Sequence, residues 1–223
     1  MARKSTTRDR LVRTATELFS RQGYGQTGVN EIMQQARATS GSFYHFFPAK
    51  EDLLLAVLDH VGETLHGEVL GPAAEGTEDP IERVFAVLAY YRRYLVDTNF
   101  ALGSPMGNLA AELSESHPQV RSKVSELFAA WTAEVEAFLG EAGDRLPPDL
   151  DNTGLAEFVL STMEGAVMQA RARRSLAPFD ASVAQLRRYF DLLRGEDVKA
   201  DEVPASLVSI PRKAPQNADW RSW

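Results

Sequence analysis

Residues 27–54 have the sequence TGVNEIMQQARATSGSFYHFFPAKEDLL, and this stretch decides the fold. Ile32, Met33 and Ala36 are spaced as one apolar stripe of a short helix. A tight connection and a second short helix follow, and Pro48 ends the second helix before a third begins. The pattern predicts a helix-turn-helix followed at once by another helix, which is an arrangement typical of DNA binding.

The second short helix, residues 41–46, has small polar residues at its start and aromatic residues behind them. Thr39 or Ser40 is well placed to cap it, because a hydroxyl oxygen can accept a free backbone N–H. A reading helix needs this layout, since its first side chains reach the bases while its back packs on the domain. Tyr44 and His45 could face either the core or DNA. The better core candidates are Phe43, Phe46 and Phe47.

This stretch resembles the N-terminal pattern of the TetR family of bacterial repressors, and the match covers about the first 60 residues. The departures from the pattern are Gly28 for a second Thr, Arg37 for a turn Gly and Ser40 for a Lys. A non-glycine residue at the turn predicts mild backbone strain. The matching positions are Thr27, Val29, Ile32, Ala36, Gly41, Ser42, Phe43, Tyr44, Phe47, Lys50 and Leu53.

The resemblance implies roles for individual residues. It implies that Thr27 caps a helix and contacts a phosphate, that Tyr44 and Lys50 contact phosphates, and that His45 lies near the bases. A short basic arm at the N-terminus adds further contacts. The predicted DNA-binding residues are Arg3, Lys4, Thr27, Gly28, Thr39, Ser40, Gly41, Ser42, Tyr44, His45 and Lys50.

The charge is unevenly distributed along a chain whose formal net charge is −7. Residues 1–50 hold eight basic and three acidic side chains, which gives +5. The remaining residues hold 16 basic and 28 acidic side chains, which gives −12. A basic N-terminal part on an otherwise acidic chain predicts that this part contacts nucleic-acid phosphates. The alternative is that the surface charge is uneven by chance.

Composition excludes several classes of protein. The 223 residues suit one or two domains with a sizeable core. Cysteine is absent, which excludes disulfides, thiolate catalysis and Cys-ligated zinc. The opening MARKSTTRDR is basic without an apolar signal core, and no run of about 18 apolar residues follows. We therefore expect a cytoplasmic protein with no membrane association.

Helical periodicity runs through the chain, and no alternating strand pattern persists. We expect an all-α protein with a helix-turn-helix domain in residues 1–48 and a connecting helix in residues 49–70. After a stretch rich in glycine, proline and acidic residues, a helical ligand-binding and dimerisation domain is expected in residues 71–195. Residues 196–223 contain three prolines and are expected to be mobile or to lie on the body through their tryptophans.

Two further motifs have plainer structural explanations. Residues 23–28 match G-x-G-x-x-G, but a dinucleotide site needs this motif after a strand, and here it follows an amphipathic helix. We expect these glycines to end one helix and to let the next approach the DNA backbone. His60, Glu63 and His66 are three residues apart rather than at the i, i+4 spacing of paired helical ligands. A solvated helix face is therefore expected there, with no metal and no cofactor.

The second half of the chain is rich in aromatic and methionine side chains. At helical spacing such side chains ordinarily form core. The family resemblance, however, implies a helical ligand cavity, and such cavities are mostly apolar with a few polar groups. The predicted lining residues are Phe85, Tyr91, Tyr94, Met106, Asn108, Leu109, Phe128, Trp131, Phe158, Met163 and Glu164.

Residues 103–112, GSPMGNLAAE, are similar to a Gly-Cys-x-x-x-Asn-Leu-x-x-Glu segment of one TetR subgroup. Members of that subgroup respond to reactive electrophiles, to acrylate and to flavonoids. In the electrophile sensors the Cys is the reactive residue, and Ser104 stands in its place here. A neutral hydroxyl without a partnering base is a poor nucleophile. We therefore expect a non-covalent effector that is largely apolar or aromatic.

The last two predicted helices, residues 153–174 and 180–194, are expected to pair with their mates as a four-helix bundle. We predict a homodimeric repressor that binds a palindromic operator in double-stranded DNA and is released by a small-molecule effector. An activator of the same fold and a dimeric DNA-binding protein without a ligand are the alternatives, and nothing supports an enzyme. The predicted interface residues are Leu155, Val159, Val167, Leu186, Phe190 and Leu193.

Overall fold

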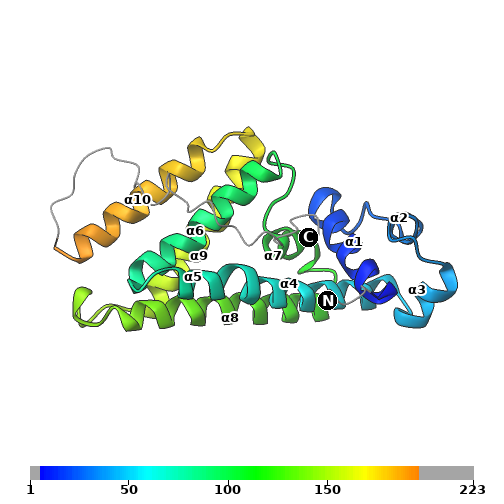
Figure 1. Ribbon diagram of the computed structural model, residues 1–223, viewed down its shortest axis with the longest axis horizontal. Coiled ribbons are helices and arrows are strands. Elements are labelled where there is room, and N and C mark those ends of the chain that lie inside the picture. Colours follow the sequence, from blue (N-terminus) through cyan, green and yellow to red (C-terminus); the bar gives the residue numbers. More distant parts are fainter. Residues whose placement is uncertain (1–5, 196–223) are drawn as a thin grey trace. The chain divides into compact units, whose positions relative to one another are not determined.

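The computed structural model describes residues 6–195, which form helices joined by short connections and contain no strand (Figure 1). The all-α fold expected from the sequence is confirmed. Within this range no helix is long and apolar enough to cross a membrane. The same residues contain no group of three metal-ligating side chains that could hold an ion. They divide into two compact units, one of residues 6–65 and 104–127 and the other of residues 66–103 and 128–195.

The first unit is built around its first helix, which packs on four of the other helices of the unit. Leu11 and Ala15 of that helix are fully buried and Phe19 is nearly so. Thr6 and Asp9 form a capping box at its start. The helices of this unit are α1 (Thr7–Gln22), α2 (Val29–Gln35), α3 (Ser40–Phe46), α4 (Lys50–Thr64), α7 (Pro105–Leu113) and the first part of α8 (Pro118–Glu141).

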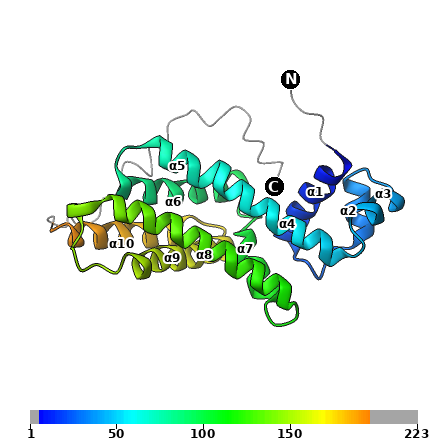
Figure 2. The ribbon, with the colours of Figure 1, turned by 90° about the horizontal axis from the view of Figure 1, so that it is seen from below.

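The second unit contains the rest of α8 and the last two helices, α9 (Asn152–Arg173) and α10 (Ala177–Leu193), which pack along each other (Figure 2). Helix α6 (Pro80–Asp97) packs on α9, and α5 (Gly71–Gly76) packs on α6. Two short segments complete the unit, the π-helical segment η1 (Leu65–Leu70), which starts at the boundary between the units, and the 3-10 turn η2 (Gly143–Arg145).

The chain remains helical from Leu65 to Gly76, across the point at residue 71 where the sequence pattern placed a domain boundary after the connecting helix. Pro72 lies in the first turn of α5. It follows closely on the π-helical segment η1, and Leu70 before α5 keeps a helical backbone, so the chain passes through Pro72 without a break. Proline and glycine composition alone therefore predicted the end of the helix too early.

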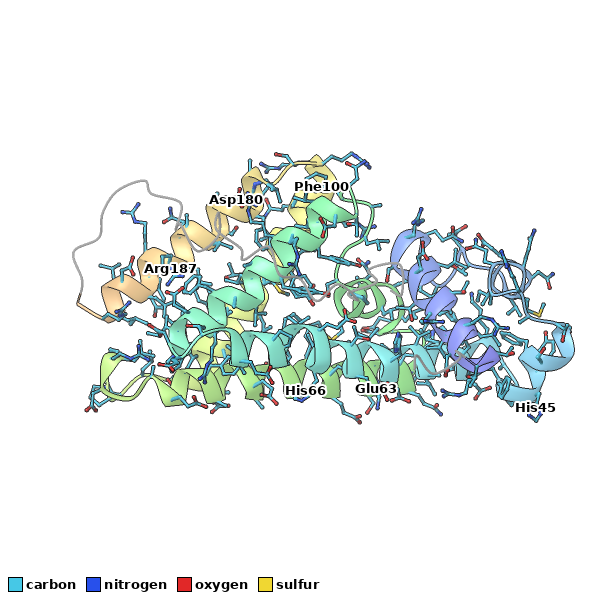
Figure 3. All side chains as sticks on the ribbon, in the orientation of Figure 1. His45, Glu63, His66, Phe100, Asp180 and Arg187 are labelled. Atoms are coloured by element: carbon cyan, nitrogen blue, oxygen red, sulfur yellow. The ribbon has the colours of Figure 1, made fainter. Side chains whose placement is uncertain are left out.

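Two polar bridges tie α10 to α6 in the second unit. Arg92 donates two hydrogen bonds to the carboxylate of Asp180, at 2.8 and 3.1 Å. Arg187 makes a two-point contact with Glu82, and its guanidinium carbon lies 3.3 Å from the centre of the Phe85 ring. Asp180 and Arg187, both on α10, are labelled in Figure 3. Paired two-point contacts of this kind fix the orientation of one helix on the other.

Candidate DNA-binding interface

Helix α3 begins in a capping box that sets the direction of its first turn. The Ser42 N–H donates to the Thr39 hydroxyl at 3.2 Å, and the Thr39 N–H donates to the Ser42 hydroxyl at the same distance. Thr39 is therefore the cap, rather than Ser40. Because the Ser42 hydroxyl accepts the Thr39 N–H, the Ser42 side chain is held at the start of the helix instead of extending freely outward.

The two sides of α3 differ in burial. Phe43 is fully buried and Phe47 nearly so, and these rings anchor the helix on the rest of the unit. Tyr44 is 55% exposed, and His45 is exposed as well. Figure 3 shows the His45 side chain pointing away from the ribbon at the outer edge of this unit. An exposed polar edge on a buried aromatic back is the geometry that a reading helix requires.

Phe46 was expected in the core, and this expectation is wrong. Its side chain is 37% exposed, and its ring makes edge contact with His45 at 4.9 Å between centroids. Phe43 and Phe47 are four residues apart and share the buried face. Phe46 directly precedes Phe47 and so lies about 100° around the helix from it. Apolar character alone does not place a residue on the inner face of so short a helix.

The turn between α2 and α3 has the strained backbone that the sequence predicted. Arg37 adopts a φ of +51°, in the left-handed region where glycine is favoured. The Ala36 carbonyl beside it accepts a hydrogen bond from Arg10 of α1 at 3.1 Å. This contact with α1 holds the turn in place and so fixes the angle at which α3 leaves it.

Thr27 does not fulfil the role implied for it. Its side chain is 1% exposed, and its hydroxyl donates to the Gly23 carbonyl at 2.6 Å. The cap residue of α2 is Gly28, which has no side chain to accept a bond. Thr27 therefore closes the loop between α1 and α2 from inside and cannot offer its hydroxyl to a phosphate.

Lys50, at the start of α4, is engaged within the protein. Its ammonium donates to the Tyr24 carbonyl and lies 3.8 Å from the centre of the Tyr24 ring. Burial lowers the pKa of Lys50, and the carboxylate of Glu112 opposes that shift. A phosphate contact by Lys50 would need the ammonium to share or leave this site, so that role stays a prediction. Arg3 and Lys4 lie outside the described residues.

The residues predicted to line a ligand pocket are divided between the two units. Met106, Asn108 and Leu109 belong to α7 in the first unit. In the second unit, Tyr91 of α6 stacks on Trp131 of α8 with 5.6 Å between ring centroids. The remaining predicted lining residues of the second unit are Phe85, Tyr94, Phe128, Phe158, Met163 and Glu164.

The surroundings of Trp131 combine burial with unusual polarity. Trp131 is fully buried, and its indole N–H has no hydrogen-bond partner. Burial raises the pKa of Tyr91 well above its usual value, and the charge of Glu164 raises it further. A buried donor left unpaired is costly, so its presence here needs an explanation. Phe158, by contrast, is 50% exposed and does not share this buried setting.

The interface predicted on α9 and α10 needs correction, because most of its residues are core. Of the six residues predicted for the interface, Leu193 is the one that is partly exposed. The large apolar side chains that α9 and α10 do expose are Phe158, Met168, Tyr189 and Leu192. The remaining five predicted residues are buried within a single chain, and they are Leu155, Val159, Val167, Leu186 and Phe190.

A helix-turn-helix with an exposed, capped second helix defines a DNA-binding protein, and comparison with known proteins identifies its family. Residues 11–57 match the family described as bacterial regulatory proteins, tetR family. Residues 80–185 match the C-terminal domain of LmrA/YxaF-like transcriptional regulators. The chain belongs to the TetR family and is a transcriptional regulator rather than an enzyme.

Individual relatives agree with this assignment. An uncharacterised HTH-type transcriptional regulator of Mycobacterium tuberculosis, Rv0196, is 32% identical over 81% of this chain and 92% of its own length. The HTH-type transcriptional repressor DhaR of a Mycobacterium species is 27% identical over 79% of this chain and 88% of its own. The crystal structure of a TetR regulatory protein from Rhodobacter sphaeroides has a TM-score of 0.78 at 25% identity, covering 83% of this chain and 99% of that one.

Proposed function

We propose that this regulator is a homodimeric repressor that binds a palindromic operator and is released by a small apolar or aromatic molecule bound in its second unit. Tyr44 and His45 on α3 support the DNA-reading part of the proposal, because both are exposed on the outer side of the helix. The relative DhaR is itself named a repressor.

The dimer part of the proposal rests on the exposed apolar side chains of α9 and α10. The rings of Phe158 on α9 and Tyr189 on α10 lie 5.9 Å apart, so the two helices expose one continuous aromatic surface. Leu192 adds to the exposed apolar area, at 62% exposure. A second copy of the chain would remove this surface from water, which is the dominant gain in association.

The effector part of the proposal is carried by the unpaired indole N–H of Trp131. An aromatic ligand with a carbonyl, ether or hydroxyl oxygen would satisfy this donor while stacking against Trp131 or Tyr91. Glu164 near Tyr91 makes the site unfavourable for anions. Ser104 stands where related sensors have a reactive Cys, and its hydroxyl caps α7 by accepting a hydrogen bond from the Gly107 N–H. Because the sequence contains no cysteine, sensing cannot proceed through thiol chemistry.

The test uses a DNA duplex selected by the full chain from a random-sequence pool. Neutral aromatic ketones and phenols are screened for release of this duplex, alongside the parent hydrocarbons that lack the oxygen. We expect release by the oxygen-bearing compounds, recovery of DNA binding after dialysis, and weaker release of the variant Trp131→Phe. If no compound shifts either operator affinity or melting temperature, the alternative without a ligand is favoured. A covalent adduct in the mass spectrum would contradict reversible sensing.

A further inference from the structure

Two sequence motifs that are far apart in the chain meet in the first unit. The loop between α1 and α2 carries the motif Gly23–Gly28, and α7 carries Glu112 near its end. The Glu112 carboxylate accepts hydrogen bonds from the backbone N–H of Tyr24 at 2.9 Å and of Gly25 at 2.6 Å. One charged side chain thus holds two consecutive amides of the loop that leads into the helix-turn-helix.

The glycines of the loop make room for this carboxylate. Gly23 has a φ of +87°, and a Cβ added there would lie 2.9 Å from one carboxylate oxygen of Glu112. A Cβ added at Gly25 would lie 3.1 Å from the other oxygen. Gly28 has open space around it. The first two glycines of the motif therefore admit a carboxylate, and their N–H groups are occupied by protein rather than offered to DNA.

Tyr24 is held from several sides once Glu112 has bound its N–H. Its carbonyl accepts a bond from Lys50, so that a carboxylate and an ammonium hold the two sides of one peptide segment. Its ring makes edge contacts with Phe19 at 5.3 Å and with His117 at 5.6 Å between centroids. Tyr24 is therefore held through its backbone by two charged side chains and through its ring by two aromatic neighbours.

The same face of α7 also contacts the end of α1. Asn108 lies one turn before Glu112, so the two side chains share a face of the helix. The Asn108 amide donates to the Ser20 carbonyl at 3.5 Å, a long bond that adds direction more than strength. Helix α7 is also where the chain returns to the first unit after residue 103. A displacement of α7 would therefore act directly on the loop before α2.

We propose that Glu112 is a positioning residue for DNA binding, whose carboxylate clamps the loop between α1 and α2 so that α2 and the reading helix keep one orientation. Glu112 does not itself contact DNA. Its loss leaves the helices intact but lets the loop take up several positions. Operator affinity then falls, because only a fraction of the molecules presents the competent geometry.

The test compares Glu112→Ala and Glu112→Gln with the charge-matched control Glu115→Gln. Glu115 is exposed and lies three residues further along the chain. The full chain is measured against its selected operator duplex and against a scrambled duplex. Hydrogen exchange of the Tyr24 and Gly25 amides reports on the clamp itself. We expect both amides to exchange at least about tenfold faster in Glu112→Ala, because each loses a bond to a charged acceptor.

Operator affinity of Glu112→Ala should fall by about tenfold, with affinity for the scrambled duplex unchanged or slightly raised. Removal of a negative charge should by itself strengthen binding to any DNA. A loss of operator affinity in Glu112→Ala would therefore be opposite in sign to the effect of the charge alone. Gly25→Ala brings a Cβ to 3.1 Å from a carboxylate oxygen of Glu112, so it should cause a smaller loss of the same kind. That loss should disappear when Glu112→Ala is already present.

Three results would overturn the proposal. One is wild-type operator affinity in both Glu112 variants, and another is an equal loss of affinity on the operator and on the scrambled duplex. The third is full additivity of Gly25→Ala with Glu112→Ala. If Glu112→Ala does not fold, the comparison of Glu112→Gln with Glu115→Gln decides, since Glu112→Gln keeps the shape of the side chain while removing its charge.

Discussion

Tyr44 and His45 are adjacent exposed side chains on α3, and they should contribute to DNA binding in different ways. Phosphate contacts carry little sequence information, whereas contacts to base edges do. We expect Tyr44→Ala to weaken binding to the operator and to other sequences by similar factors. His45→Ala should instead change base preference, by about 1–3 kcal/mol at the contacted position.

Binding of both variants to a panel of operator duplexes with single base changes measures this difference. His66→Ala is the matched control, since it removes an exposed histidine that lies outside the helix-turn-helix. A changed base preference in Tyr44→Ala, together with an unchanged preference in His45→Ala, would mean that the two roles are reversed.

Residue identities in the helix-turn-helix predicted the fold better than they predicted individual contacts. The cap of α3 and the strained turn at Arg37 follow from local rules, because hydroxyl caps and positive φ depend on the nearest residues in sequence. The inward direction of Thr27 and the engagement of Lys50 with Tyr24 depend on neighbours from other helices. Lys50 is also influenced by the charge of Glu112, which lies 62 positions further along the chain. No local sequence pattern reveals a neighbour so far away.

At the scale of helices, the existence of α9 and α10 could be predicted, but the face that each exposes could not. The apolar stripe of Leu, Val and Phe is the best-buried face of each helix, and it packs within the chain. An interface assembled from the strongest stripe therefore coincided with the core. The exposed set includes Tyr189 and Met168, which a sequence pattern does not distinguish from ordinary surface variation.

The exposed and buried faces of α10 predict different outcomes for neighbouring substitutions. Leu192→Glu should yield folded monomers, because a charge within the proposed dimer interface would oppose association while the core stays intact. Phe190→Ala should destabilise the fold itself by about 3–5 kcal/mol, since Phe190 is fully buried. Sedimentation and thermal unfolding separate the two effects. Val96→Glu, on an exposed apolar residue of α6, is the control. A wild-type dimer from Leu192→Glu would place the interface elsewhere.

The cap of α6 predicts a pH-dependent contribution to stability. Asp79 accepts bonds from the Ile81 and Glu82 N–H groups and pairs with Arg145. Burial opposes ionisation of Asp79, but these partners outweigh it and the pKa lies below its usual value. A lowered folded-state pKa means that the stabilisation is present above the unfolded pKa and is lost as pH falls through the folded value.

Asp79→Ala should therefore cost roughly 1 kcal/mol of unfolding free energy at pH 7. The difference from wild type should shrink only below about pH 3.9, where the unfolded carboxyl begins to be protonated. Urea unfolding at a series of pH values measures it, with the exposed Asp149→Ala as the control. A difference that stayed constant down to the lowest pH would argue against an ionised cap.

On the scale of the whole molecule, the charge asymmetry and the fold both assign DNA binding to the N-terminal part of the chain. The head of the chain, residues 1–50, carries +5 and includes the helix-turn-helix, while the remainder carries −12. We expect the acidic remainder to be repelled by the DNA phosphates, since like charges repel. Family membership establishes regulation of transcription, and the two-fold pairing of heads is the central structural claim of the proposed repressor.

Selection of DNA from a random-sequence pool by the full-length protein tests that claim most directly. A dimer with two reading helices should enrich an inverted repeat whose half-sites are about 10–10.5 base pairs apart, or a multiple of that spacing. Two chains should bind each selected duplex. Enrichment of a single site without two-fold symmetry, bound by one chain, would contradict the account.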